Sequence, residues 1–231
     1  MVRRTSRATP AGQETRADAA HADAVSRPLA SDVSLPITTK RLIIRPCTEA
    51  DLEDLHAVWS DPEVMGPVPS KAYDREQSRA RLTEKIRHQQ RHGFSKWAVA
   101  ERASGKVIGE CGLHYLEGGP DIELGYKLAR AHWGRGLAAE AAHACLSWAR
   151  EERPERVVAI VDPANTRSVR ILEKIGMVRA GVFSRFGHTW DFYIADCATR
   201  IKQRAARPHA PPGAYLSSRS QYPTGNSRTF R

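Results

Sequence analysis

The chain has 231 residues, of which 41% are apolar, with a formal net charge of +10 and four cysteines. This length suits one folded domain with tails. No stretch approaches about 18 consecutive apolar residues, so we expect no membrane-spanning helix. The basic start MVRRTSRATP lacks a following apolar stretch, which argues against a secretory signal. The cysteines form no CxxC pair, which argues against a zinc site and a dense disulfide framework. We therefore predict a cytoplasmic protein that binds no metal.

The positive charge is concentrated near the C-terminus. Residues 201–231 contain six basic and no acidic residues, whereas residues 36–200 carry a net charge of +3. Neither 1–35 nor 201–231 has enough large apolar side chains to offset the entropy of ordering. We predict two disordered tails, 1–35 and 201–231, around one domain at 36–200. A basic tail attracts phosphates without reading a sequence, so nucleic acid is expected as a partner only through the C-terminal tail.

The domain alternates strands and helices. Apolar runs bounded by turn residues predict strands, and apolar residues at helical spacing after an N-cap residue predict helices. In chain order we expect a strand at 41–45, a helix that follows Thr48 and stops at Asp61-Pro62, a helix at 75–91, strands at 96–101, 107–115 and 121–128, a helix at 137–150, a strand at 157–161, a helix at 165–174, and strands at 177–184 and 190–196. A meander followed by alternating elements predicts an α/β (α+β) fold with a mixed sheet covered by helices.

The stretch from Leu124 to Glu140 carries the clearest chemical signal. A strand ends, the loop Trp133-Gly-Arg-Gly-Leu-Ala138 follows, and an Ala-rich helix begins. The first N–H groups of a helix have no intrahelical acceptor, the helix dipole adds positive charge there, and glycines allow close approach. These features predict a pyrophosphate site with Arg135 at its rim. An ordinary loop is the alternative, since GxGxxG would need glycine at Ala139 and GK[ST] is absent.

Four segments occur in an informative order. They are Thr39-Lys-Arg-Leu-Ile-Ile-Arg-Pro46 with Asp51-Leu52, Ile108-Gly-Glu-Cys-Gly-Leu113, Glu123-Leu-Gly-Tyr126 with Trp133-Gly-Arg-Gly-Leu-Ala138, and Asn165-Thr-Arg-Ser168 with Leu172-Glu-Lys-Ile-Gly-Met177. Together they resemble the GNAT acetyltransferase superfamily, in particular the branch that includes the ribosomal-protein N-terminal (alanine/serine) acetyltransferases. The resemblance covers roughly residues 37–197.

The resemblance implies a mostly antiparallel sheet in which the strands at 121–128 and 157–161 splay apart, with acetyl-CoA bound in the gap. The residues that it implies for acetyl-CoA are the loop N–H groups of Gly134, Arg135, Gly136, Leu137 and Ala138 beside Trp133, the strand edge of Leu124, Tyr126 and Leu128, and the helix residues Asn165 and Ser168. Many members have a tyrosine as general acid where this chain has Leu172, so that role is vacant or held elsewhere.

Acetyl transfer to an amine needs a base, because an ammonium has no lone pair. The thioester oxygen also needs hydrogen-bond donors as it gains charge. Glu123 is the first candidate base, acting through water, and Glu110 is the second, with His114 on the same face of its strand. Ser168 is a candidate for contact with the thioester or thiolate. Each residue also has a plain structural interpretation, as a salt-bridge partner, a polar side chain or an exposed helix hydroxyl.

These observations predict an acetyl-CoA-dependent N-acetyltransferase. The acceptor is a primary amine, either a protein N-terminus, which the branch resemblance favours, or a small molecule, and residues 60–75 and 184–190 are expected to form its groove. Two alternatives remain: a nucleic-acid- or ribosome-binding protein of the same fold, and a catalytically weak acetyl-CoA sensor. The sequence is compatible with a monomer or a homodimer.

Overall fold

The computed structural model describes residues 35–66, 72–116, 119–153, 155–185 and 188–195. The two tails predicted from the sequence lie outside these ranges, apart from Leu35, so their disorder stays a prediction. No helix in the described ranges is long and apolar enough to cross a membrane.

The described residues form an eight-stranded sheet in the order β1-β2-β3-β4-β5-β6-β8-β7. The strands are β1 (Ile37–Thr38), β2 (Leu42–Arg45), β3 (Lys96–Glu101), β4 (Val107–Tyr115), β5 (Ile122–Leu128), β6 (Val157–Val161), β7 (Met177–Arg185) and β8 (His188–Ala195). All neighbouring pairs are antiparallel except β5 and β6. This confirms the mixed, mostly antiparallel sheet.

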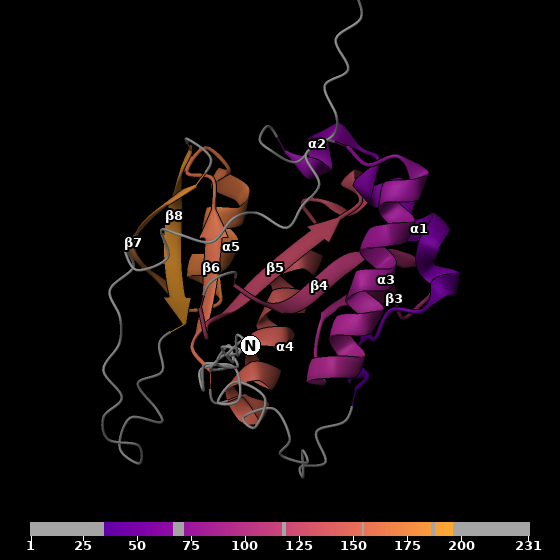
Figure 1. Ribbon diagram of the computed structural model, residues 1–231, viewed down its shortest axis with the longest axis horizontal. Coiled ribbons are helices and arrows are strands. Elements are labelled where there is room, and N and C mark those ends of the chain that lie inside the picture. The colour runs from indigo at the N-terminus through magenta and orange to yellow at the C-terminus, as the bar shows by residue number, and fades with distance from the viewer. Residues whose placement is uncertain (1–34, 67–71, 117–118, 154, 186–187, 196–231) are drawn as a thin grey trace, which may run out of the picture. The chain divides into compact units, whose positions relative to one another are not determined.

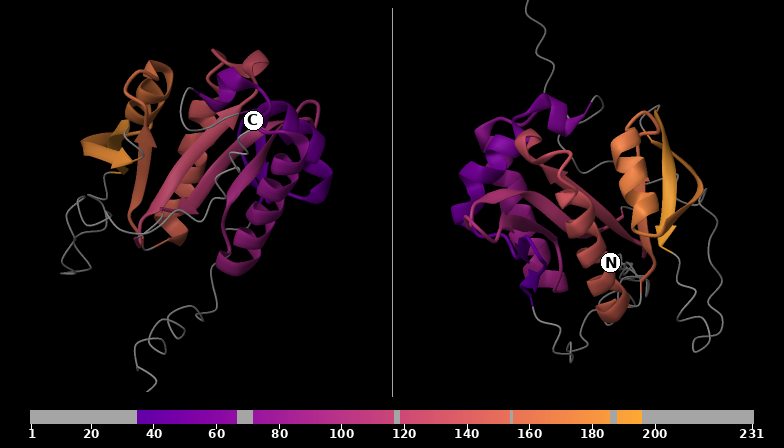
Figure 2. Two further views of the ribbon diagram at one scale, coloured as in Figure 1. Left: turned by 45° about the horizontal axis from the view of Figure 1, so that its top comes forward. Right: turned by 180° about the vertical axis from the view of Figure 1, so that it is seen from behind.

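Helices cover both faces of the sheet. They are η1 (Glu49–Asp51), α1 (Leu52–Trp59), α2 (Pro62–Met65), α3 (Arg75–His92), η2 (Arg130–His132), α4 (Leu137–Glu152) and α5 (Thr166–Lys174). Figure 1 shows α1 and α3 on one face, and the view from behind in Figure 2 shows α4 and α5 on the other. Two buried clusters match this arrangement, a larger one between the sheet and α4 and a smaller one under α1 and α3.

Local signals explain most helix ends, with one correction. Asp74 and Gln77 form a reciprocal capping box at the start of α3, and Gly93 ends this helix with φ +77°. The sequence Asp61-Pro62 was expected only to stop a helix. In the structure the Asp61 side chain accepts the N–H of Glu63, so the pair also begins α2. Proline is favoured at the first helical position, because a backbone N–H there would have no acceptor within the helix.

The sheet opens between β5 and β6. These strands pair only at Ile122 with Val157 and at Glu123 with Val158, whereas β5 stays paired with β4 as far as Leu128. Figure 1 shows the two strands diverging from their shared lower end. The predicted splay is therefore confirmed, and it leaves the backbone of β5 beyond Glu123 without a strand partner on the side of β6.

Candidate functional site

The loop between η2 and α4 presents unused hydrogen-bond donors. Gly134 and Gly136 have φ of +73° and +74°, a left-handed conformation that favours glycine. Within the described part of the chain, none of the backbone N–H groups of residues 134–138 donates a hydrogen bond. A Cβ at Gly134 would have no atom within 4 Å, so the loop faces open space. Free N–H groups at the start of a 16-residue helix make a site for an anion.

A network of side chains holds this loop in place. Arg41 donates through Nη1 to the carbonyl oxygen of Arg135 at 2.8 Å and through Nε to Oε2 of Glu140 at 2.7 Å. Oε1 of Glu140 accepts the Thr39 hydroxyl at 2.6 Å and the Arg41 N–H at 2.9 Å. The C=O and the following N–H of a trans peptide point in opposite directions. Arg41 thus turns the N–H of Gly136 away from itself.

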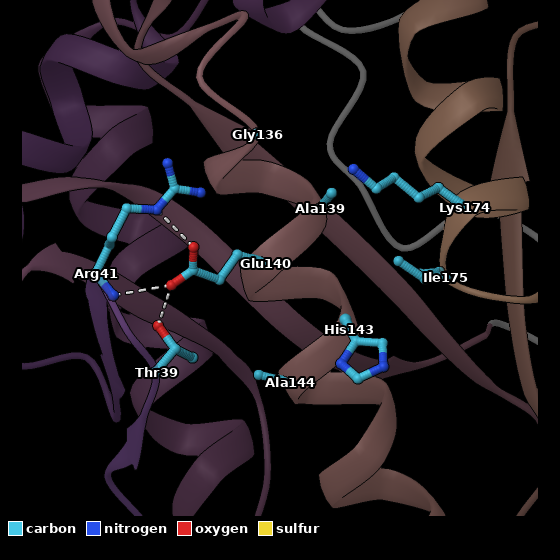
Figure 3. A pocket seen from close by; sticks show the side chains of 9 residues that line it. All are labelled: Thr39, Arg41, Gly136, Ala139, Glu140, His143, Ala144, Lys174 and Ile175. Carbon is cyan, nitrogen blue, oxygen red and sulfur yellow. Dashed lines mark hydrogen bonds and ion pairs between the residues drawn. The ribbon is translucent and has the colours of Figure 1, made fainter.

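A pocket of about 390 Å³ adjoins the loop (Figure 3). It is lined by Thr39, Arg41, Gly136, Ala139, Glu140, His143, Ala144, Lys174 and Ile175. In Figure 3 the side chains of Arg41 and Glu140 approach it from one side of α4 and that of Lys174 from the other. The pocket therefore joins the first turns of α4 to the end of α5.

The first turn of α5 faces the open edge of β5. The Tyr126 hydroxyl donates to the backbone oxygen of Ser168 at 3.2 Å, and Oδ1 of Asn165 accepts the N–H of Ser168 at 3.1 Å. Burial raises the pKa of Tyr126, so its hydroxyl stays protonated. Leu124 and Leu128 point into the core beside α4. The structure thus brings together the predicted residues of β5 and α5 across the gap.

Trp133 connects the end of β5, the loop and α5. Its Nε1 donates to the backbone oxygen of Leu128 at 2.7 Å, and the Arg167 guanidinium lies 4.9 Å from its ring centroid. The sequence reasoning gave Arg167 no role, although it lies within the Asn165–Ser168 motif. Leu172, where many relatives are expected to have tyrosine, is buried in the main core.

The remaining loop residues divide between core and surface. Leu137 is buried and Ala138 packs against the core, so only their backbones are available to a ligand. The Arg135 side chain is about half exposed, lies 3.1 Å from Glu101 and contacts His132. Its guanidinium is therefore partly exposed beside the loop and already has a carboxylate partner.

The two glutamates predicted as bases occupy different environments on the α1 and α3 face. Glu110 is 1% exposed and lies 2.6 Å from Nζ of Lys85 and 3.3 Å from Nη2 of Arg81. Burial alone would raise the pKa of Glu110, but these two cations hold it well below its ordinary value. Glu123 is 27% exposed and lies 3.7 Å from Nζ of Lys96. Both carboxylate oxygens of Glu110 are thus held in ion pairs, whereas the Glu123 carboxylate is partly exposed to solvent.

His114 belongs to a ring cluster on this face. It stacks on His88 with ring centroids 4.1 Å apart, and its Nδ1 lies 3.0 Å from the backbone oxygen of Tyr115. Burial lowers the pKa of His114 and lowers that of His88 to about 4. His88 is buried in α3 together with Ser78, Leu82 and Lys85, so this side of the helix packs against β4.

Comparisons with known proteins agree with this geometry. Residues 41–178 match the family model described as acetyltransferase (GNAT) domain. The uncharacterized N-acetyltransferase YnaD of Bacillus subtilis is 30% identical over 69% of this chain and 95% of its own. The GNAT-family acetyltransferase structure from Bacillus anthracis has 29% identity and a TM-score of 0.59, covering 68% of this chain and 95% of that one. RimL, a ribosomal L7/L12 alpha-N-protein acetyltransferase in complex with coenzyme A, has a TM-score of 0.59 over 69% and 98% of the two chains, and its 18% identity supports the fold alone.

Proposed function

The chain belongs to the GNAT acetyltransferase family, and we propose that it transfers the acetyl group of acetyl-CoA directly to a primary amine. One observation carries the proposal: the unpaired edge of β5 leads straight to a loop whose N–H groups have no acceptor among the described residues. A long ligand with an anionic end and amide groups along its length fits both features.

The donor set suits acetyl-CoA as the co-substrate. Pyrophosphate oxygens only accept hydrogen bonds, and residues 134–138 offer only N–H donors. The pantetheine amides are complementary to the open backbone edge at Leu124 and Tyr126 and to the N–H of Leu128, whose oxygen already accepts Trp133 Nε1. Asn165 and Ser168 then lie beside the arm and the thioester, since Tyr126 already contacts Ser168. The Trp133 ring then lies at the end of β5, next to the pyrophosphate.

Glu123 is the proposed general base. It removes a proton from the acceptor ammonium through a water molecule, and the free nitrogen attacks the thioester carbon. The C–N bond forms, the C–S bond breaks, and the second proton that the nitrogen loses passes to the departing thiolate. The half-buried hydroxyl of Ser168 is the proposed donor toward the thiolate, because Leu172 offers none. Glu110 is the weaker candidate base, because its ion pairs stabilise the charged form.

The acceptor is proposed at the level of a primary amine, and a protein N-terminus is the class that the branch resemblance favours. Parts of the expected groove, residues 67–71 and 186–187, lie outside the described residues. A small-molecule amine is the alternative acceptor, since one fold serves many acceptors, and the protein is proposed to act as a monomer or a homodimer.

The test measures thiol release from acetyl-CoA with a panel of primary amines, for the wild type and two matched variants. Glu123→Gln is expected to lower kcat about 100-fold without changing the melting temperature or the affinity for acetyl-CoA. Glu110→Gln instead lowers the stability by about 3 kcal/mol, because the buried Lys85 and the partly buried Arg81 lose their carboxylate. Tight acetyl-CoA binding without thiol release on any amine would support the sensor alternative. Full activity of Glu123→Gln would exclude Glu123 as the base.

A further inference from the structure

Six charged side chains gather on the face of the sheet that carries Glu123, and we call them the acceptor-side cluster. They are Arg81 and Lys85 of α3, Lys96 of β3, Glu110 of β4, and Glu123 and Lys127 of β5. Four are cations and two are carboxylates, so the cluster has a formal charge of +2 at neutral pH. The inference below rests on the proposed function, in which the acceptor amine approaches Glu123.

Lys127 is the cation left without a counter-ion. It is the direct cross-strand partner of Glu110. However, both oxygens of Glu110 are already engaged, one with Lys85 and the other with Arg81. Glu123 in turn has Lys96 as its neighbour. Among the described residues, no carboxylate lies within ion-pair distance of Lys127.

Burial and mutual repulsion make the charged forms of these cations unfavourable in the folded protein. The Arg81 guanidinium lies 5.4 Å from the ring centroids of both Trp59 and Tyr73 and donates to the Tyr73 hydroxyl, which fixes its position. Burial lowers the pKa of Lys85 and of Lys127 to about 8. Like charges in a partly dry site repel, and an uncompensated charge there is unfavourable. A bound anion would relieve both effects.

The cluster lies within reach of an amine at Glu123. Glu123, Gly125 and Lys127 alternate along one face of β5, so the Cα atoms of the first and last are about 13 Å apart. The Lys96 side chain crosses the strand between them, since a Cβ on Gly125 would lie 2.7 Å from its Nζ. A small molecule that extends from Glu123 along this face therefore meets the Lys96 ammonium first and then the partly exposed Lys127.

We propose that the acceptor amine carries an acidic group, a carboxylate or a phosphonate, that binds Lys127 and the neighbouring cations of the acceptor-side cluster. An amine without an acidic group lacks this anchor, and the positive cluster also repels a polycationic amine.

The experiment compares kcat/KM for matched pairs of amines by thiol release. Amino acids are tested against their carboxamides, and aminoalkylphosphonates against alkylamines of equal length. The acidic member is expected to be about 10- to 100-fold better, the range for hydrogen bonds to a charged group. In Lys127→Met the ratio within each pair falls to about one, and Lys127→Arg restores it. Lys106→Met, which removes an exposed lysine remote from the cluster, is the matched control and keeps the wild-type ratio.

Equal or better use of the carboxamides by the wild type would overturn the proposal, as would a ratio that Lys127→Met leaves unchanged. The preference of one acid over the other distinguishes a carboxylate from a phosphonate acceptor. If no amine releases thiol, the proposed function fails. The acidic-group proposal is then tested by ligand binding without turnover. N-acetylalanine must then bind the coenzyme A complex of the wild type more tightly than N-acetylalaninamide does, and the difference must disappear in Lys127→Met.

Discussion

A single charge placed at Gly134 tests the anion site directly. Asn and Asp have nearly the same shape and both tolerate the left-handed conformation that this position requires. A side chain here projects into open space, since no atom lies within 4 Å of a Cβ. The variants Gly134→Asn and Gly134→Asp therefore share any strain and steric effect. They differ only in one negative charge beside the proposed pyrophosphate.

The expected difference follows from Coulomb's law. Two unit charges about 5 Å apart in a water-like dielectric interact by roughly 0.8 kcal/mol, so one carboxylate against two phosphate charges costs about 1.7 kcal/mol. This corresponds to about 15-fold weaker binding of acetyl-CoA to the Asp variant than to the Asn variant. A lower local dielectric at the start of α4 would enlarge the factor.

Titration calorimetry with acetyl-CoA measures this ratio, at low salt and at about 0.5 M salt. Screening reduces the ratio at high salt, since the Debye length then falls below about 5 Å. Acetyl-pantetheine, which lacks the pyrophosphate, is the control ligand and must bind both variants equally. Affinities within twofold of each other, or a ratio that salt leaves unchanged, would refute a pyrophosphate site on this loop.

Two further predictions concern residues beyond the loop itself. Arg41→Ala is expected to raise KM for acetyl-CoA about tenfold while leaving that for acetyl-pantetheine unchanged, because Arg41 orients the peptide between Arg135 and Gly136; an equal loss with both substrates would show that it supports only the fold. Burial lowers the pKa of His88 from 6.5 to about 4 in the folded protein. Between these pH values the unfolded state binds more protons than the folded state does. The free energy of unfolding therefore falls as the pH drops through this range. The slope reaches at most about 1.4 kcal/mol per pH unit for this one proton; urea unfolding at several pH values should show a smaller slope in His88→Gln, and an unchanged slope would assign the acid sensitivity to other groups.

Short-range patterns in the sequence determined the elements and the loop. The spacing of apolar residues identified β3, β4 and β5 within a residue, because a strand or helix is decided by neighbouring residues. The glycines Gly134 and Gly136 marked the loop before α4 for the same local reason, and the structure added their left-handed conformation. Period-two alternation correctly placed Glu110 and His114 on one face. The two-residue strand β1 and the four-residue helix α2 were missed, because such short elements contain less than one period of any pattern.

Only the tertiary structure decided which distant residues meet. Arg41 and the Arg135 carbonyl are 94 residues apart, and Arg81 and Glu110 are 29 apart. No local pattern connects such pairs, because their contact depends on the order of strands in the sheet and on which face each helix covers. The same holds for the two candidate bases. Glu110 and Glu123 look alike in the sequence, but the packing of α3 buries one among cations and leaves the other partly exposed.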